Sequence, residues 1–76
     1  MKELIEFIVK ALVDDPGSID IKEVAGDKIT IFELRASKGD IGKVIGKRGR
    51  TASSIRTILN AVSARQGKRA VLEIIE

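Results

Sequence analysis

Apolar residues recur at intervals of three and four positions near the start of the chain. Charged residues stand between them, and the apolar set is Leu4, Ile5, Ile8, Val9 and Leu12. This spacing predicts an amphipathic helix over residues 2–13, with one face packed on a core. The segment Asp14-Asp15-Pro16-Gly17 is a strong turn signal and ends the helix.

The next part of the chain has the pattern of two strands. Residues 19–24 begin with alternating apolar and polar positions, and residues 28–35 are rich in β-branched and apolar side chains. Gly26-Asp27 lies between them and favours a tight turn. These segments therefore predict a β-hairpin.

Helical spacing returns in the second half of the chain. We expect a short helix over residues 40–45 that ends at Gly46, then a longer helix over residues 50–65 that is ended by Gly67. An apolar run over residues 70–75 is the last strand. The predicted order is αββααβ, and we interpret residues 1–76 as a single domain.

The order of the elements also predicts the sheet. Two helices between strands 28–35 and 70–75 form a crossover connection, so these strands should be parallel neighbours. The hairpin places strand 19–24 antiparallel on the other side of 28–35. The sequence thus predicts an α+β fold, in which a three-stranded mixed sheet carries three helices on one face.

Composition argues against several kinds of chemistry. The 76 residues include no Cys and no His, so disulfides, the commonest metal ligands and the usual general base are missing. The phosphate-binding P-loop pattern fails, since Gly42 is followed five positions later by Lys47 rather than glycine. We expect no enzyme activity, no catalytic residue, no metal and no cofactor.

The hydrophobic segments are short and interrupted by charges. None approaches the roughly 20 apolar residues of a membrane span. Residues 2–13 also lack the unbroken apolar run and cleavage site of a signal peptide. We expect a cytoplasmic protein without a membrane partner.

Charge is divided unevenly along the chain. Residues 1–36 carry five cations and eight anions, whereas residues 37–70 carry nine cations and Asp40 as their one anion. A basic half on a nearly balanced chain is typical of proteins that bind polyanions.

The turn motif Gly46-Lys47-Arg48-Gly49, followed by Arg50, lies within this basic half. Glycine leaves room for a ligand to approach the main chain. The helix after the turn offers free N–H groups and the positive end of its dipole. Two glycines three positions apart also occur in ordinary turns between helices, but such turns do not need three adjacent cations. The motif predicts a clamp on a phosphate backbone.

The element order, together with the segments Val44–Thr51 and Ser54–Ile58, resembles a type II KH domain. The whole chain is similar to the small bacterial single-KH RNA-binding proteins of the KhpA type. This resemblance implies that the turn holds about four single-stranded RNA nucleotides, whose bases lie on an apolar groove. The implied RNA-binding residues are Gly46, Lys47, Arg48, Gly49, Arg50, Lys43 and Arg56. The implied groove residues are Ile41, Val44, Ile45 and Ile55, for which simple core packing is the alternative.

The resemblance also implies a cellular role and protein partners. It implies an RNA chaperone or post-transcriptional regulator linked to cell-envelope synthesis and cell-shape control. It further implies a homodimer, or a heterodimer with a larger KH-containing RNA-binding protein. Ile29 and Ile31 lie on the opposite face of their strand from Phe32 and Leu34, so an open sheet face would be partly apolar and could receive a partner.

Two alternatives remain open at this point. The basic half could bind an acidic protein, and the chain would then be an interaction module indifferent to Gly46 and Gly49. The clamp could also take single-stranded DNA, because phosphate contacts do not distinguish it from RNA. Phe7 and Phe32 are the only aromatic residues, and we expect both in the core. Without aromatic platforms for the bases, binding should be weak and sensitive to salt.

Overall fold

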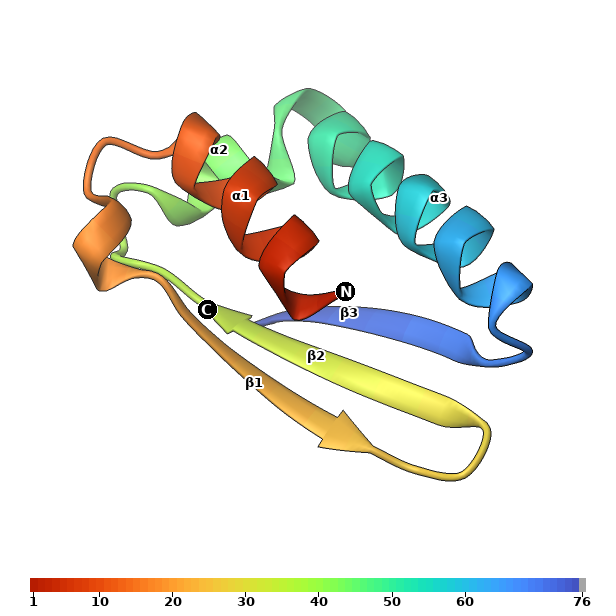
Figure 1. Cartoon of the computed structure of the whole chain (residues 1–76). Coiled ribbons are helices and arrows are strands. Elements are labelled where there is room, and N and C mark those ends of the chain that lie inside the picture. The colour runs from red at the N-terminus through yellow and green to blue at the C-terminus, as the bar shows by residue number, and fades with distance from the viewer. Residues whose placement is uncertain (76) are drawn as a thin grey trace.

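The helices and the sheet lie in two layers (Figure 1). The computed structural model describes residues 1–75. The elements in chain order are α1 (Lys2–Leu12), β1 (Asp20–Ala25), β2 (Ile29–Arg35), α2 (Ile41–Ile45), α3 (Arg50–Arg65) and β3 (Arg69–Ile75). Short 3₁₀ turns occupy Pro16–Ser18 and Lys47–Gly49.

The expectation of three helices is met only in part. Helices α1 and α3 are full helices of 11 and 16 residues, whereas α2 has five residues, little more than one turn. Gly46 ends α2 at the predicted position, because its backbone leaves the helical conformation there. The helical layer therefore consists mainly of α1 and α3.

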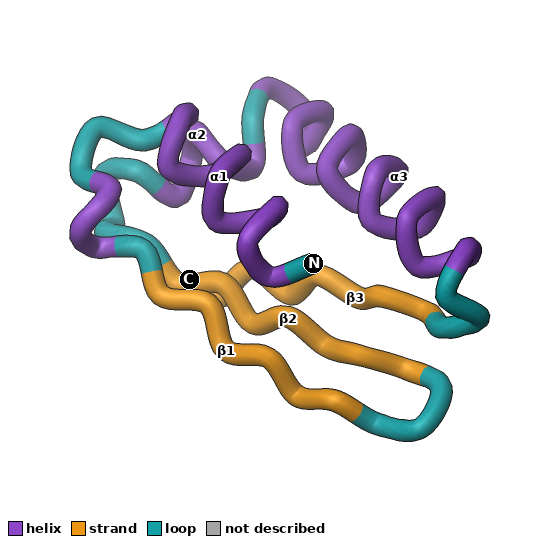
Figure 2. The backbone as a smooth tube through the Cα atoms, in the orientation of Figure 1, coloured by secondary structure: helices purple, strands orange, loops and turns teal. Residues whose placement is uncertain are grey.

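The sheet has the predicted topology. Its order is β1-β2-β3, with β1 antiparallel and β3 parallel to β2. The backbone trace shows the β1–β2 loop and the α3–β3 loop at the same end of the sheet (Figure 2). A hydrogen bond from the Arg69 N–H to the Lys28 carbonyl, 2.8 Å long, links the start of β3 to the residue before β2 at this end. The α2–α3 turn lies in the helical layer, away from both loops (Figure 1).

The core lies between the sheet and the two long helices. Phe32 and Leu34 of β2 are buried against Ile5 of α1 and against Ile55 and Leu59 of α3. The period of two in β2 accounts for this arrangement, because alternate side chains point to the helical layer. The expected burial of Phe32 is confirmed.

The expected burial of Phe7 was wrong, since this side chain is 76% exposed. The stripe of α1 that faces the sheet is centred on Ile5 and Val9, both fully buried. Phe7 lies two residues after Ile5, which is about 200° around the helix axis. Its ring therefore lies on the far side of α1 from the core.

A buried carboxylate ties the end of α1 to the start of α2. Asp40 is only 4% exposed, and it accepts hydrogen bonds from the N–H groups of Asp14 at 3.2 Å and Asp15 at 2.9 Å. Lys43 forms ion pairs with Asp14 and, at 3.5 Å, with Asp40. The backbone bond from Asp15 is the main cause that lowers the pKa of Asp40. The hydrogen bond to Asp14 is the main cause that raises the pKa of Lys43.

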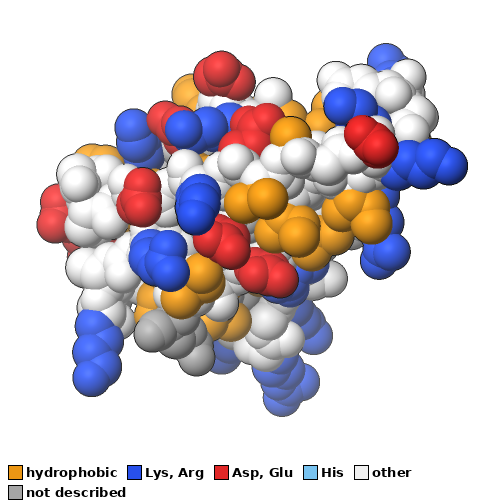
Figure 3. Space-filling model, turned by 90° about the horizontal axis from the view of Figure 1, so that it is seen from below, with side chains coloured by type: hydrophobic (Ala, Val, Ile, Leu, Met, Phe, Trp, Pro, Cys, Tyr) orange, Lys and Arg blue, Asp and Glu red, His pale blue; other side chains and the backbone are white. Residues whose placement is uncertain are grey.

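The other face of the sheet is not covered by any helix. The register aligns Val24, Ile31 and Val71 in one row across the three strands, and Ile29 lies next to this row. Val24 and Ile29 are 44% and 43% exposed. The view from below shows hydrophobic side chains gathered among charged ones (Figure 3). Within residues 1–75, no helix has the length and apolar character needed to cross a bilayer.

Candidate nucleic-acid interface

The turn between α2 and α3 has a backbone that ordinary residues adopt rarely. Gly46, Arg48 and Gly49 have φ values of 77°, 58° and 74°. Gly46 also has ψ of 172°, a combination that is essentially confined to glycine. Glycine adopts positive φ without steric cost, so the strain in this tight turn lies at Arg48. Such strain is found preferentially at functional sites.

Gly46 is required for a second reason. A Cβ atom built at this position would lie 2.8 Å from the backbone nitrogen of Thr51 at the start of α3. Backbone cannot move aside as a flexible side chain can, so any side chain here would push α3 away. At Gly49 a Cβ atom would meet open space, and only the positive φ favours glycine.

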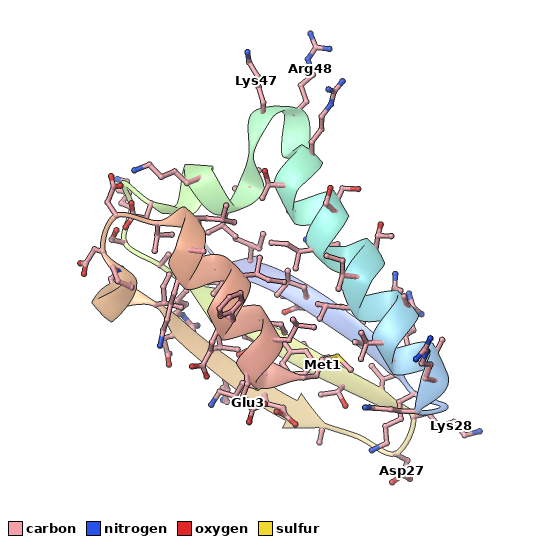
Figure 4. All side chains as sticks on the ribbon, turned by 45° about the horizontal axis from the view of Figure 1, so that its top comes forward. Met1, Glu3, Asp27, Lys28, Lys47 and Arg48 are labelled. Carbon is pink, nitrogen blue, oxygen red and sulfur yellow. The ribbon has the colours of Figure 1, made fainter. Side chains whose placement is uncertain are left out.

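The turn projects its cations into solvent. Lys47 and Arg48 point away from the body of the molecule at the tip of the turn (Figure 4). Together with Arg50 they line a shallow hollow. Among the described residues, no carboxylate forms an ion pair with any of these three cations. Their positive charge is therefore available to an anionic ligand.

The start of α3 adds to this positive region. No side chain caps the N-terminus of α3, where Gly49 is the N-cap residue. The first N–H groups of a helix have no partner within the helix, and the helix dipole is positive at this end. The N–H of Gly49 donates to the Gly46 carbonyl at 3.1 Å, and the N–H of Arg50 donates to the Lys47 carbonyl. The contribution of this helix end is therefore the positive end of its dipole, which lies beside the side-chain cations.

Two of the predicted RNA-binding residues are already engaged elsewhere. Lys43 pairs with Asp14 and Asp40, so its charge is largely compensated within the protein. Arg56 donates from Nε and Nη2 to the carbonyl oxygen of Leu72, at 3.4 and 3.2 Å. The structure therefore brings together Lys47, Arg48 and Arg50 at the turn but not Lys43 or Arg56.

The predicted groove residues also divide into two groups. Val44 is fully buried and Ile55 is 2% exposed, so both belong to the core and neither can touch a ligand directly. Both lie in the hydrophobic core cluster, which is what the alternative of simple core packing expects. Ile41 and Ile45 are partly exposed beside the turn, and they remain candidates for contact with a base.

Comparison with known proteins identifies the family. The model of the family described as "KhpA/KhpB, KH domain" matches residues 2–74 of this chain. The chain belongs to the KhpA/KhpB KH domain family. It is 51% identical over 74 residues to the RNA-binding protein KhpA of Borreliella burgdorferi, covering 97% of this chain and 90% of that one.

Other relatives in this family match over nearly their full length. The RNA-binding protein KhpA of Chlamydia trachomatis is 51% identical over 76 residues, covering 100% of this chain and 97% of that protein. The RNA-binding protein KhpA of Clostridium perfringens is 49% identical over 75 residues, covering 99% of this chain and 100% of that protein. No solved structure matches the chain.

The sequence located the turn of this KH domain but missed several of its contacts. The three-residue spacing of Asp40 and Lys43 on a helix could have indicated their ion pair. The approach of Gly46 to Thr51 and the bond from Arg56 to Leu72 depend on how α3 lies on its neighbours. No local pattern in the sequence signals either contact.

Proposed function

We propose that this KH domain, over residues 1–76, binds single-stranded RNA through the turn Gly46–Gly49. The observation that carries the proposal is a group of three cations, with no ion-pair partner among residues 1–75, on a glycine-dependent turn at the start of α3. The relatives named RNA-binding protein KhpA support RNA as the polyanion.

The geometry suggests how each part of the site acts. Gly46 and Gly49 let the sugar-phosphate chain approach the main chain. Lys47, Arg48 and Arg50 contact phosphates, and the positive end of the α3 dipole favours the same negative charge. Ile41 and Ile45 provide an apolar surface beside the turn for the attached bases.

Binding of this kind should be weak and strongly dependent on salt. Phosphate contacts by the three cations Lys47, Arg48 and Arg50 on a single strand predict a loss of about two units of log affinity for each tenfold rise in salt. Phe32 is buried, and Phe7 lies on α1 rather than at the turn. The site therefore has no aromatic platform on which bases could stack.

We further propose the finer role that the resemblance implies. The protein acts as an RNA chaperone or post-transcriptional regulator in the bacterial cytoplasm, linked to cell-envelope synthesis and cell shape. It pairs with a second copy or with a larger KH-containing RNA-binding protein. The partly apolar sheet face and the joint KhpA/KhpB family description support a protein partner.

The experiment compares binding of short single-stranded RNA by the natural chain and by a Lys47→Asp, Arg48→Asp variant. Fluorescence anisotropy measures the affinity at about 150 mM salt. An Arg65→Asp, Lys68→Asp variant is the control, because it has the same net charge and changes exposed cations far from the turn. We expect the turn variant to lose at least about 100-fold in affinity, since both phosphate contacts become repulsive.

The control variant should keep its affinity within a few-fold. If the turn variant and the natural chain bound the RNA with equal affinity, the proposal that the Gly46–Gly49 turn holds the phosphate backbone would be wrong. The basic half would then be better explained as a surface for an acidic protein partner. Parallel titrations with DNA of the same sequence measure the preference between the two nucleic acids.

A further inference from the structure

The face of the sheet that no helix covers is divided into rows of different character. Its middle row is apolar and consists of Val24, Ile31 and Val71. The neighbouring row on one side has a net negative charge and consists of Lys22, Glu33 and Glu73. In the row on the other side, Ile29 lies beside Arg69. The view from below shows acidic side chains on one side of the hydrophobic ones and basic side chains on the other (Figure 3).

The apolar side chains of this face are open to solvent. Val24 and Ile29 are 44% and 43% exposed, and Ile31 is half-buried. Arg69 and Glu73 are exposed, and neither forms an ion pair among residues 1–75. An apolar centre between charged margins has the anatomy of a protein–protein contact.

The face is complementary to a second copy of itself. Two sheets that pack face to face lie about 10 Å apart, and in a symmetric pair a twofold axis runs between them. An axis across the strands, along the apolar row, places that row on its own copy. Glu73 follows Val71 by two residues and Arg69 precedes it by two, so Glu73 then lies over Arg69 of the second copy. The symmetry repeats this ion pair.

A twofold axis along the central strand β2 is the other way to cover the whole face. It would place Glu33 over Glu33 of the second copy, and Arg35 over its own copy as well. Like charges that meet across an interface are strongly unfavourable. The axis across the strands avoids this, because it places Glu33 over Ile29. The charge pattern therefore selects one orientation.

We propose that two copies of this chain pair through their uncovered sheet faces, with the twofold axis along the apolar row. This inference rests on the proposed pairing with a second copy, and it assigns the surface and the orientation. The helical layers then lie on the outside, where the Gly46–Gly49 turn of each copy stays open (Figure 1). An RNA strand long enough to reach both turns gains avidity from the second one.

The contact is small, so the pairing is weak. Three strands of about seven residues give a flat area of about 14 by 23 Å, or about 320 Å² for each copy. A standard interface buries about 800 Å² for each partner. The ion pairs between Arg69 and Glu73 lie on the edge strand β3, where water still reaches them, and they fix orientation more than affinity. We expect a reversible dimer with a dissociation constant on the order of 100 μM.

The test reverses the two charges one at a time. Arg69→Glu brings two carboxylates together at each ion pair, and Glu73→Arg brings two guanidinium groups together. Sedimentation velocity at about 50 mM salt, from about 10 μM to about 1 mM protein, measures the dissociation constant. We expect each variant to weaken the dimer at least about tenfold. Arg65→Glu is the matched control, because it makes the same change of charge on α3, and it should leave the dimer unchanged.

An equal mixture of the two single variants is the decisive sample. In a pair with one copy of each, every reversed charge faces an opposite one, so the dimer should form again with about the natural affinity. This recovery would also show that both variants fold. The double variant Arg69→Glu, Glu73→Arg exchanges the charges within one chain and should dimerise like the natural chain. Loss in both single variants without recovery in the mixture and in the double variant overturns the proposal.

The outcomes separate this dimer from RNA binding at the turn. A natural chain that binds a short single-stranded RNA but stays monomeric up to about 1 mM keeps the clamp and overturns the dimer. A natural chain that dimerises as described but does not bind RNA overturns the clamp alone. A dimer that is insensitive to Arg69→Glu and to Glu73→Arg uses another surface, and it overturns the sheet face while the proposed pairing with a second copy stands.

Discussion

Gly46 and Gly49 both have positive φ, yet a side chain would meet different surroundings at the two positions. At Gly46 a Cβ atom would contact the backbone nitrogen of Thr51, and the φ and ψ values belong to a region reserved for glycine. At Gly49 the backbone is left-handed and the space beyond it is open. The two glycines of the motif are therefore not equivalent in what they contribute to stability.

We predict that Gly46→Ala destabilises the fold by about 3 kcal/mol or more, through strain and displacement of α3. Gly49→Ala should lower the free energy of unfolding by only about 1 kcal/mol, the usual cost of placing one residue other than glycine in the left-handed region. Urea unfolding followed by circular dichroism measures both. Gly49→Asn is a matched control, because Asn tolerates the left-handed region and should lose less than Ala. Equal losses at Gly46 and Gly49 would show that the Thr51 contact is unimportant.

At the scale of elements, the sequence predicted what depends on local periodicity. The helix over residues 50–65 and the strand over 70–75 were found within one residue, because glycine marks their ends. The parallel pairing of β2 with β3 followed from the crossover alone. Features that depend on packing were missed, as for Phe7, whose burial depends on how α1 is rotated on the sheet.

The candidate site shows the same division. The cationic turn was evident from Gly46 to Arg50, since all its residues are adjacent in sequence. The roles of Val44 and Ile55 could not be decided in advance, because a groove floor and a core have the same composition. Arg56 was assigned to the ligand by its charge, and only the fold shows the carbonyl of Leu72 beside it.

Asp40 connects the end of α1 to the start of α2, and we predict that replacing it lowers the stability of the fold. Asp40→Asn should lower the melting temperature by about 5 °C or more, because the N–H groups of Asp14 and Asp15 lose a charged acceptor. Asp27→Asn in the exposed hairpin loop is the control and should change it little. Thermal unfolding at pH 7 followed by circular dichroism measures the difference.

The pH dependence of this difference has a defined sign. The pKa of Asp40 is lowered by folding, so the stability it contributes is present above the unfolded pKa of about 3.9 and is lost as the pH falls through the folded value. The melting temperatures of the natural chain and of Asp40→Asn should therefore converge below about pH 4. The pKa of Lys43 is raised, so its contribution stays constant until the pH exceeds about 10.4. If the difference in melting temperature were the same at pH 3 as at pH 7, the charge of Asp40 would not be the source of its stabilising effect.

At the scale of the whole molecule, the distribution of charge determines what a ligand senses. The molecule measures 35 × 22 × 19 Å, and the turn and the end of α3 are separated by most of the length of that helix. Arg65 lies about 22 Å along α3 from Arg50. The screening length is about 8 Å at 0.15 M salt and about 30 Å at 0.01 M. At physiological salt, a phosphate at the turn thus senses Lys47, Arg48 and Arg50 but hardly Arg65.

This separation makes the two charge-reversal variants respond differently to salt. The variant Arg65→Asp, Lys68→Asp should weaken RNA binding clearly at about 10 mM salt, because charges across the whole molecule then act on the ligand. At about 150 mM salt the same variant should bind RNA almost as well as the natural chain. Lys47→Asp, Arg48→Asp should abolish binding at both, because its charges lie at the contact itself. Anisotropy titrations of both variants at the two salt concentrations make the comparison. If the distant pair were as damaging as the turn pair at 150 mM, RNA would bind along the length of α3, and the turn would be one part of a longer basic surface.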